Sequence, residues 1–181
     1  GTAAILAPGT EQPLETFENS GYDISFSGLP AQTTGTASLV TGIPGRENAQ
    51  VLDLAYDFTS GTGSRFAYAV LNKAGGGIDV AGTPSAMTLE MLGDSSMNYA
   101  RAEFVQADGK TVLVDVARQI DWSGWKTVRV DLSAVGLKGP AKLTKLYVVN
   151  LEQDQDERAL QGEVAFDDLK LQYPPKTIPT V

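Results

Sequence analysis

Hydrophobic and polar residues alternate with a period of two along most of this chain, which is the pattern of β-strands with one buried face. The segment 50–58 is the clearest case, because Leu52 and Leu54 fall on one face and Asp53 lies between them. The same alternation recurs at residues 14–18, 22–26, 37–41, 65–71, 87–92, 98–106, 111–117, 126–132, 143–150 and 163–173. No segment sustains the 3.6-residue period of an amphipathic helix, so we expect an almost entirely β chain with under about one-tenth helix.

Glycine-containing turns separate these segments, as at residues 60–63 and 75–77. Glycine can supply the positive φ angle that tight turns between strands require. The sequence Ala-Asp-Gly-Lys at residues 107–110, between two alternating segments, predicts a β-hairpin. About ten short strands joined in this way predict an all-β fold, an antiparallel two-sheet β-sandwich of the jelly-roll type.

The two ends of the chain lack this alternation. Residues 1–12 include Pro8 and Gly9, and residues 174–181 include three prolines. We interpret both segments as linkers to neighbouring domains of the same parent chain. Residues 13–173 then form a single β-sandwich domain, long enough to bury a core of its own.

Histidine and cysteine are both absent from the 181 residues. Because these side chains supply most acid–base groups, thiol nucleophiles and soft-metal ligands, their absence excludes Ser-His-Asp triads, Cys-His dyads and transition-metal sites. Carboxylate-only glycoside hydrolysis and hard-cation sites remain open. A net charge of −8 opposes binding to nucleic acids and to anionic membranes. We therefore expect a module that is not an enzyme and has no nucleic-acid or membrane partner.

Several short motifs occur in an order that resembles a known family. The sequence reads LETFEN at residues 14–19, LDLAYDF at 52–58, LEMLGD at 89–94, YARA at 99–102, IDWSGWK at 120–126 and VAFDDLKL at 164–171. Over residues 14–173 this order resembles the carbohydrate-binding-type jelly-roll modules of secreted bacterial proteins. The resemblance is strongest to the modules appended to phosphodiester glycosidases and to S-layer-associated surface proteins. It implies an extracellular or cell-surface module without catalysis of its own.

The resemblance also implies a structural calcium ion (Ca2+) held by Glu18, Asp167 and Asp168. If the first and last strands pair, these carboxylates come close together and repel one another unless a cation neutralises them. The alternative is that the three carboxylates cap turns or face solvent. Residues 152–158 form a second acidic segment that echoes a calcium-binding loop, but Glu157 stands where such a loop requires glycine. We interpret that segment as a solvated hairpin loop.

Aromatic and polar side chains alternate away from the expected core on three strands. Tyr99, Arg101 and Glu103 share one face of their strand, and Tyr68 and Tyr147 occupy corresponding positions on two others. If these strands are neighbours, the five side chains line a concave sheet where rings stack on the apolar faces of a glycan. The alternative is that half of the tyrosines are core residues with a hydroxyl at the edge. Tyr99 also stands where modules of this type often have tryptophan.

The two tryptophans, Trp122 and Trp125, are interpreted as structural. Trp125 directly precedes an expected strand, where a tryptophan commonly plugs the end of a sandwich core. For Trp122 an exposed position on its loop remains an alternative.

Two functions from different classes follow. The first is a non-catalytic, extracellular carbohydrate-binding module of a larger secreted or cell-surface bacterial protein, with a polysaccharide or cell-envelope glycan as partner. The second is a structural module that spaces or assembles its neighbours in a surface layer or cell envelope and binds no sugar. The aromatic content of 8% and the tyrosine at position 99 favour the second.

Overall fold

The computed structural model describes residues 3–7 and 9–180, with side chains described from residue 9 to residue 176. The strands are β1 (Ala3–Ala7), β2 (Thr10–Glu15), β3 (Ile24–Leu29), β4 (Thr34–Val40), β5 (Val51–Asp57), β6 (Arg65–Leu71), β7 (Ile78–Val80), β8 (Ala86–Asp94), β9 (Tyr99–Gln106), β10 (Thr111–Ala117), β11 (Ser123–Asp131), β12 (Ala141–Asn150), β13 (Gln161–Tyr173) and β14 (Lys176–Thr180). Two 3₁₀ turns, η1 (Lys73–Gly75) and η2 (Gln155–Glu157), complete the elements. Strands make up 55% of the chain and no α-helix occurs in the described residues, which confirms the all-β prediction.

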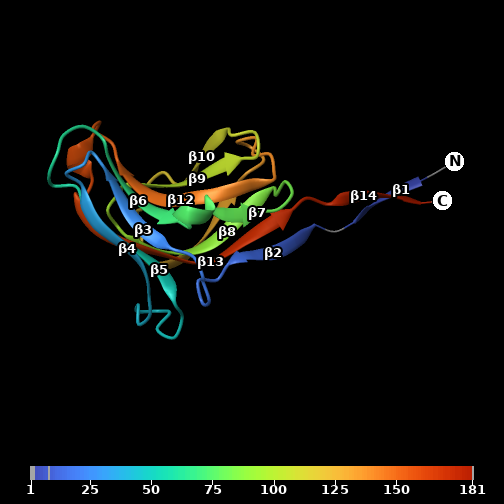
Figure 1. Ribbon diagram of the computed structural model, residues 1–181, viewed down its shortest axis with the longest axis horizontal. Helices are drawn as coiled ribbons and strands as arrows, with labels where there is room; N and C mark the ends of the chain where they lie inside the picture. The colour runs from blue at the N-terminus through green and yellow to red at the C-terminus, as the bar shows by residue number, and fades with distance from the viewer. Residues whose placement is uncertain (1–2, 8, 181) are drawn as a thin grey trace.

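The strands form two antiparallel sheets that pack face to face, one above the other in Figure 1. The upper sheet has the order β10-β9-β12-β6-β3, and β7 pairs with one end of β12. The lower sheet has the order β11-β8-β13-β5-β4, and β2 pairs with β13. The predicted antiparallel β-sandwich is therefore confirmed.

The core lies between the sheets and follows the alternation in the sequence. On β9 the residues Ala100, Ala102 and Phe104 are fully buried, and on β5 the same is true of Leu52 and Leu54. The predicted hairpin joins β9 to β10, where the Gly109 backbone has a φ of 85°. Burial of these alternating apolar side chains is the main force that holds the sheets together.

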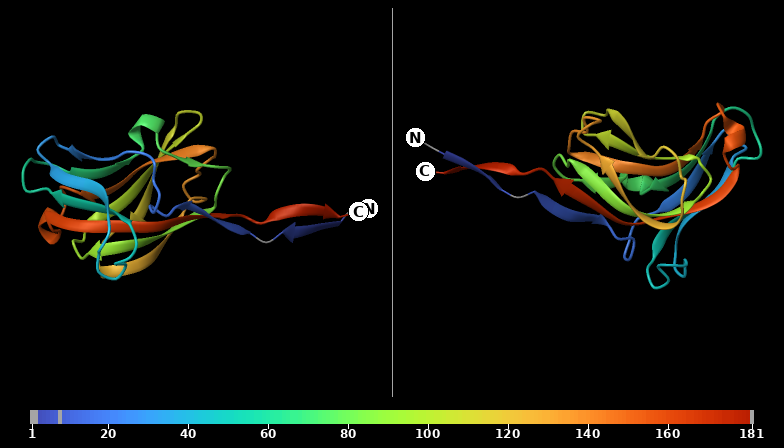
Figure 2. Two further views of the ribbon diagram at one scale, coloured as in Figure 1. Left: turned by 60° about the horizontal axis from the view of Figure 1, so that its bottom comes forward. Right: turned by 180° about the vertical axis from the view of Figure 1, so that it is seen from behind.

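The ends of the chain are more ordered than the linkers predicted from their composition. Strand β2 pairs with β13, so the strands of the lower sheet begin at Thr10, within the predicted linker 1–12, and β13 ends at Tyr173. Beyond the sandwich, β1 pairs with β14 in a two-stranded ribbon that extends away from the sheets (Figure 2). Residues 1, 2, 8 and 181 of the predicted linkers lie outside the described residues. A connection to neighbouring domains stays a prediction.

No helix in the described part of the chain is long and apolar enough to cross a membrane.

Candidate functional site

The five side chains predicted to form a ligand-binding face lie together on the upper sheet. Tyr147 of β12 is opposite Tyr68 of β6 on one side and opposite Arg101 of β9 on the other. Tyr99 and Glu103 flank Arg101 at alternate positions of β9, so they share its face. This face points away from the core, because the intervening residues of β9 are the buried ones.

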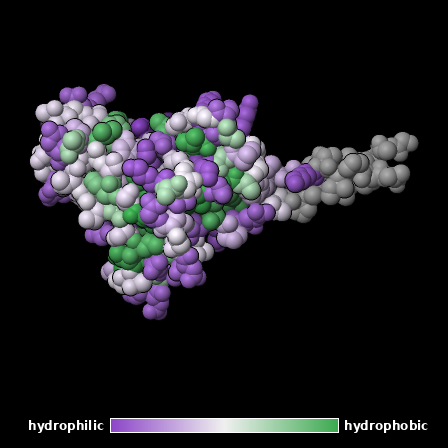
Figure 3. Space-filling view, viewed as in Figure 1, coloured by the Kyte–Doolittle hydropathy of each residue, from purple (hydrophilic) through white to green (hydrophobic). Residues whose placement is uncertain are grey.

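The free face of the upper sheet is hollowed. In Figure 1 it looks upward between the loops at one end of the sandwich and the raised β9–β10 hairpin. The space-filling view shows the upper outline dipping between these two features (Figure 3). One groove on this face has a volume of about 420 Å³ and is lined by residues that include Ser25, Ser27, Val70 and Lys145. This face is therefore hollowed, but none of the five predicted side chains lines this groove, and their role in ligand binding stays a prediction.

Aromatic rings form a continuous cluster on this face. The ring centroids of Tyr68 and Tyr147 are 4.9 Å apart, and those of Phe66 and Tyr68 are 6.0 Å apart. The Lys145 Nζ atom lies 4.9 Å from the centroid of the Tyr68 ring, within cation–π range. These contacts hold the Tyr68 ring in place before any ligand arrives.

The three tyrosines of the face differ in exposure. Tyr147 is only 3% exposed, and burial raises the pKa of its hydroxyl to about 12. Tyr68 and Tyr99 are partly exposed. Tyr147 therefore forms the floor beneath the other side chains, whereas Tyr68 and Tyr99 present ring surface to solvent. For Tyr147 the structure agrees with the alternative of a buried tyrosine.

Ion pairs organise the polar side chains of the face. The Arg101 Nε atom is 2.9 Å from the Asp115 Oδ1 atom of the neighbouring strand β10. The Lys145 Nζ atom is 3.4 Å from the Glu103 Oε1 atom, which also accepts a hydrogen bond from the Thr144 hydroxyl at 2.7 Å. Fixed donors and acceptors beside exposed rings are the groups that recognise the hydroxyls of a sugar.

An arginine from a distant loop completes the face, and strand alternation could not predict it. The guanidinium carbon of Arg158 lies 5.7 Å from the centroid of the Tyr99 ring, and that of Arg101 lies 5.2 Å from the same centroid. Arg158 ends the mostly exposed acidic segment 152–158, which connects β12 to β13. The hairpin expected for this segment is wrong, because β12 and β13 belong to different sheets and do not pair, so the loop crosses from the upper to the lower sheet. Its guanidinium donates hydrogen bonds to the carbonyl oxygens of Leu151 and Gln153, which fixes its position within the loop.

A buried amide network anchors this loop to the sandwich. The Asn98 side chain donates to the carbonyl oxygen of Ala159 at 3.0 Å, and the Asn150 amide donates to the Asn98 Oδ1 atom at 2.8 Å. The Gln155 amide then donates to the Asn150 Oδ1 atom at 2.6 Å. Asn98 and Asn150 are fully buried, so these bonds satisfy groups that would otherwise be costly to bury. The network therefore positions Arg158 over Tyr99.

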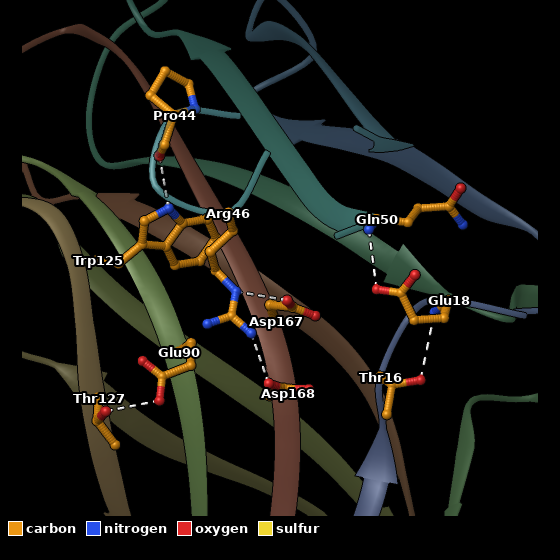
Figure 4. A network of polar contacts seen from close by, with 10 residues as sticks. All are labelled: Thr16, Glu18, Pro44, Arg46, Gln50, Glu90, Trp125, Thr127, Asp167 and Asp168. Carbon is orange, nitrogen blue, oxygen red and sulfur yellow. Dashed lines mark hydrogen bonds and ion pairs between the residues drawn. The ribbon is translucent and has the colours of Figure 1, made fainter. Parts of the chain in front are cut away.

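The carboxylates predicted to bind calcium hold an arginine instead (Figure 4). The Arg46 Nε atom is 2.8 Å from the Asp167 Oδ2 atom, and its Nη2 atom is 2.7 Å from the Asp168 Oδ2 atom. The third predicted ligand, Glu18, points to a different neighbour and accepts a hydrogen bond from the Gln50 backbone N–H at 3.0 Å. The first strand of the sandwich does pair with the last, but the pairing does not bring the three carboxylates together.

The residues as they lie here do not fit one calcium ion. Among the residues whose side chains are described, no three acidic groups converge where a metal ion could lie. The guanidinium of Arg46 supplies the positive charge that the two aspartates require. Burial raises the pKa of the Asp167 carboxyl, while the hydrogen bond from Arg46 acts in the opposite direction. Calcium binding by Glu18, Asp167 and Asp168 stays a prediction.

The tryptophans are structural, but Trp125 does not plug the core as expected. It lies within β11, opposite Leu92 on the outer face of the lower sheet. Its Nε1 atom donates to the carbonyl oxygen of Pro44 at 3.0 Å, and Arg46 lies over its ring at 5.4 Å (Figure 4). Trp125 therefore holds a loop against the sheet. Trp122 packs against the core and donates to the carbonyl oxygen of Met91 at 3.3 Å, so it is not a free loop residue.

A pair of carboxyl groups lies on the same outer face of the lower sheet. Asp53 of β5 is opposite Ala165 of β13, which places it diagonally across from Glu163. Burial raises the pKa of Asp53 to about 7, and the hydrogen bond and repulsion from Glu163 add to this effect. The Asp53 Oδ1 atom is buried and has no hydrogen-bond partner among the described residues. Burial and the neighbouring carboxylate therefore both disfavour the charged form of Asp53.

Comparison with known proteins finds similar folds among solved structures but no similar sequence. No protein-family model matches the sequence, and no curated protein matches it. Among solved structures, the chain is similar to a family 11 carbohydrate-binding module from a cellulosomal cellulase of Clostridium thermocellum, with a TM-score of 0.54, 11% identity and coverage of 90% of this chain and 94% of that one. It is similar to a family 30 carbohydrate-binding module, with a TM-score of 0.55, 13% identity and coverage of 90% and 98%. It also resembles part of an exo-β-agarase, with a TM-score of 0.50, 12% identity and coverage of 91% of this chain and 25% of that chain.

These similarities span almost the whole of both carbohydrate-binding modules. The resemblance found in the sequence motifs is therefore confirmed at the level of the fold. The chain has the two-sheet β-sandwich fold of carbohydrate-binding modules.

Proposed function

We propose that this domain is a non-catalytic carbohydrate-binding module of a larger secreted or cell-surface bacterial protein, and that it binds a glycan chain across the concave face of the upper sheet. One observation carries the proposal, namely that Tyr68, Tyr99, Arg101, Glu103 and Tyr147 come from three adjacent strands and meet on that face. The similarity to two carbohydrate-binding modules supports it, although a shared fold does not by itself determine a ligand.

Each side chain has a distinct part in the proposed recognition. The partly exposed rings of Tyr68 and Tyr99 stack on the apolar faces of successive sugar units. Arg101 and Glu103 contact hydroxyl groups, and Tyr147 supports the Tyr68 ring from below. Because such a face is shallow and open to water, we expect dissociation constants in the micromolar to millimolar range, or about −8 to −4 kcal/mol.

Affinity electrophoresis against a panel of neutral soluble polysaccharides tests the proposal. Retention by one of them should fall about tenfold in Tyr68→Ala and in Tyr99→Ala, which corresponds to about 1.4 kcal/mol for each lost stacking contact. Tyr173→Ala is the matched control, because Tyr173 lies at the end of β13 in the lower sheet and its hydroxyl bonds to the carbonyl oxygen of Ala81. Equal retention of all three variants by a polysaccharide that retains the wild type would contradict the proposal.

The alternative function is a structural module that spaces or assembles its neighbours in a surface layer or cell envelope. Exposed leucines on the same upper face favour it, because Leu29 of β3 and Leu113 of β10 are each 53% exposed. Both share the face of the tyrosines, since Leu29 is opposite Phe66 and Leu113 is opposite Glu103. Leu29→Ser together with Leu113→Ser should disrupt an assembly observed by light scattering and leave polysaccharide retention unchanged.

A further inference from the structure

A second groove lies along the open side of the sandwich, between the edge strand β10 of the upper sheet and the edge strand β11 of the lower sheet. Its volume is about 680 Å³. Val116 and Val128 contribute apolar surface to it, and Trp122 contributes an aromatic ring. Tyr99 also lines the groove, so the groove is continuous with the concave face of the upper sheet.

The charged side chains that line this groove are mostly cationic, in a chain that carries a net charge of −8. Arg118, Lys126 and Arg129 line it, against the single carboxylate of Asp121. The Arg118 side chain is 83% exposed, and its only ion pair among the described residues is a 3.4 Å contact with Asp115. All three cations lie on exposed positions, so they remain able to bind an anion in solution.

Aromatic and cationic groups alternate from the groove to the concave face. The Lys126 Nζ atom lies 4.7 Å from the centroid of the Trp122 ring. At the other end of the groove, Tyr99 lies beneath the guanidinium groups of Arg101 and Arg158. A chain of sugar rings bearing carboxylates presents the complementary pattern, because the rings have apolar faces and the carboxylates pair with guanidinium and ammonium groups.

A structural explanation for these cations is that charged residues on edge strands prevent pairing with another sheet. That explanation applies to Lys126 and Arg129 within β11. It does not account for Arg118, which follows the end of β10, or for the apolar and aromatic surface that lies beside the cations. The groove therefore has more in common with a binding site than with a protected edge.

We propose that this groove binds the carboxylate-bearing sugars of an anionic polysaccharide, such as a polyuronate, whose chain continues past Tyr99 onto the concave face. The proposal rests on the proposed function and specifies the class of glycan. Arg118 and Arg129 pair with uronate carboxylates, Lys126 adds a third positive charge, and Val128 contacts the apolar face of a sugar ring. A neutral glycan meets the tyrosines of the concave face but gains nothing from these cations.

The experiment compares polygalacturonate with the same polymer after reduction of its carboxyl groups, in a buffer that contains a calcium chelator so that calcium does not gel the acidic polymer. Isothermal titration calorimetry should show at least tenfold tighter binding of the acidic polymer at low salt. That advantage should disappear when ionic strength rises to roughly 1 M, where the screening length is about 3 Å. The variant Lys126→Gln with Arg129→Gln should lose most of that advantage and keep its affinity for the reduced polymer. Lys138→Gln is the matched control, since Lys138 is exposed and lies outside the groove.

The outcomes separate this proposal from the proposed function. If both polymers bind equally and Tyr68→Ala weakens both, the concave face binds glycans and the anionic site is refuted. If the acidic polymer binds more tightly but the groove variant keeps that preference, the charge is recognised elsewhere and the proposal is again refuted. If neither these polymers nor the neutral panel binds the wild type, both proposals fail together.

Discussion

Replacement of Asp53 by asparagine should stabilise this protein most at pH 8, less at pH 5 and little at pH 3. The Asp53 residue is 8% exposed, and its Oδ1 atom lacks a hydrogen-bond partner among the described residues. Glu163 lies diagonally opposite on β13, so an ionised Asp53 is both desolvated and repelled. An asparagine side chain is nearly isosteric, carries no charge and can donate an N–H to the Glu163 carboxylate.

The magnitude follows from the pKa. Folding raises the pKa of Asp53 from 3.8 to about 7, so the folded state binds this proton more tightly than the unfolded state. Such a carboxyl contributes its full stability below pH 3.8 and loses it progressively as the pH rises through 7. The upper limit of this loss is about 4 kcal/mol, at about 1.4 kcal/mol for each unit of pKa. For a domain of this length, that limit corresponds to about 10 °C in the melting midpoint.

Urea denaturation followed by tryptophan fluorescence at pH 5, 6, 7 and 8 measures the effect. The difference in free energy of unfolding between Asp53→Asn and the wild type should grow from pH 5 to pH 8. Asp57→Asn is a control on the same strand with the opposite expectation, because hydrogen bonds from Thr59 lower the pKa of Asp57. An Asp53→Asn variant that is equally or less stable than the wild type at pH 8 would refute the reasoning, because it would mean that the ionised carboxyl is adequately solvated.

Three further predictions concern the tyrosine floor and the acidic cluster. Tyr147→Ala should lower the free energy of unfolding by about 3–5 kcal/mol in a denaturation experiment, as expected for truncation of a buried aromatic ring. Tyr147→Phe keeps the ring and should lower it only slightly. Equal losses in the two variants would show that the hydroxyl matters more than the ring. Arg46→Met should destabilise the fold by about 1–2 kcal/mol, because it leaves the Asp167 carboxylate buried without its partner. An unchanged melting midpoint would mean that this partly exposed ion pair makes no net contribution to stability. The calcium prediction requires a higher melting midpoint in calcium than in chelator, and that difference should vanish in Glu18→Ala and Asp168→Ala. If the wild type gives the same melting curve in calcium and in chelator, calcium binding by these carboxylates is refuted.

Alternation along the sequence predicted the parts of this molecule that depend on a two-residue period. A strand with one buried face has only two sides, so a correct choice of the buried side places every other residue outward. On β9 this rule correctly placed Tyr99, Arg101 and Glu103 on the free face, opposite residues that are fully buried. The adjacency of β6, β9 and β12 was an assumption at that stage, and the sheet order confirms it.

Contacts made by loops could not be predicted in this way. Arg158 reaches Tyr99 only because buried amide groups, including Asn98 and Asn150, hold its loop, and no periodicity records such a network. Arg46 reaches Asp167 from a loop that is 121 residues away in sequence. The sequence therefore indicated that the acidic cluster needs a cation but not that a side chain provides it. Trp125 was misplaced because it lies within a strand rather than before it.

The choice between a glycan-binding and a structural module depends on how much ring surface the concave face leaves free. Tyr147 is covered, so Tyr68 and Tyr99 provide the exposed tyrosine surface, and cations lie over both rings. A cation over a ring competes with a sugar for the same surface, unless the sugar itself carries a negative charge that pairs with the cation. Because Arg101, Arg158 and Lys145 all occupy such positions, an anionic glycan fits this face better than a neutral one. The same cations would oppose docking of a purely apolar protein surface, which must desolvate them without compensation. Charge on the ligand is therefore the property that most directly separates the two functions.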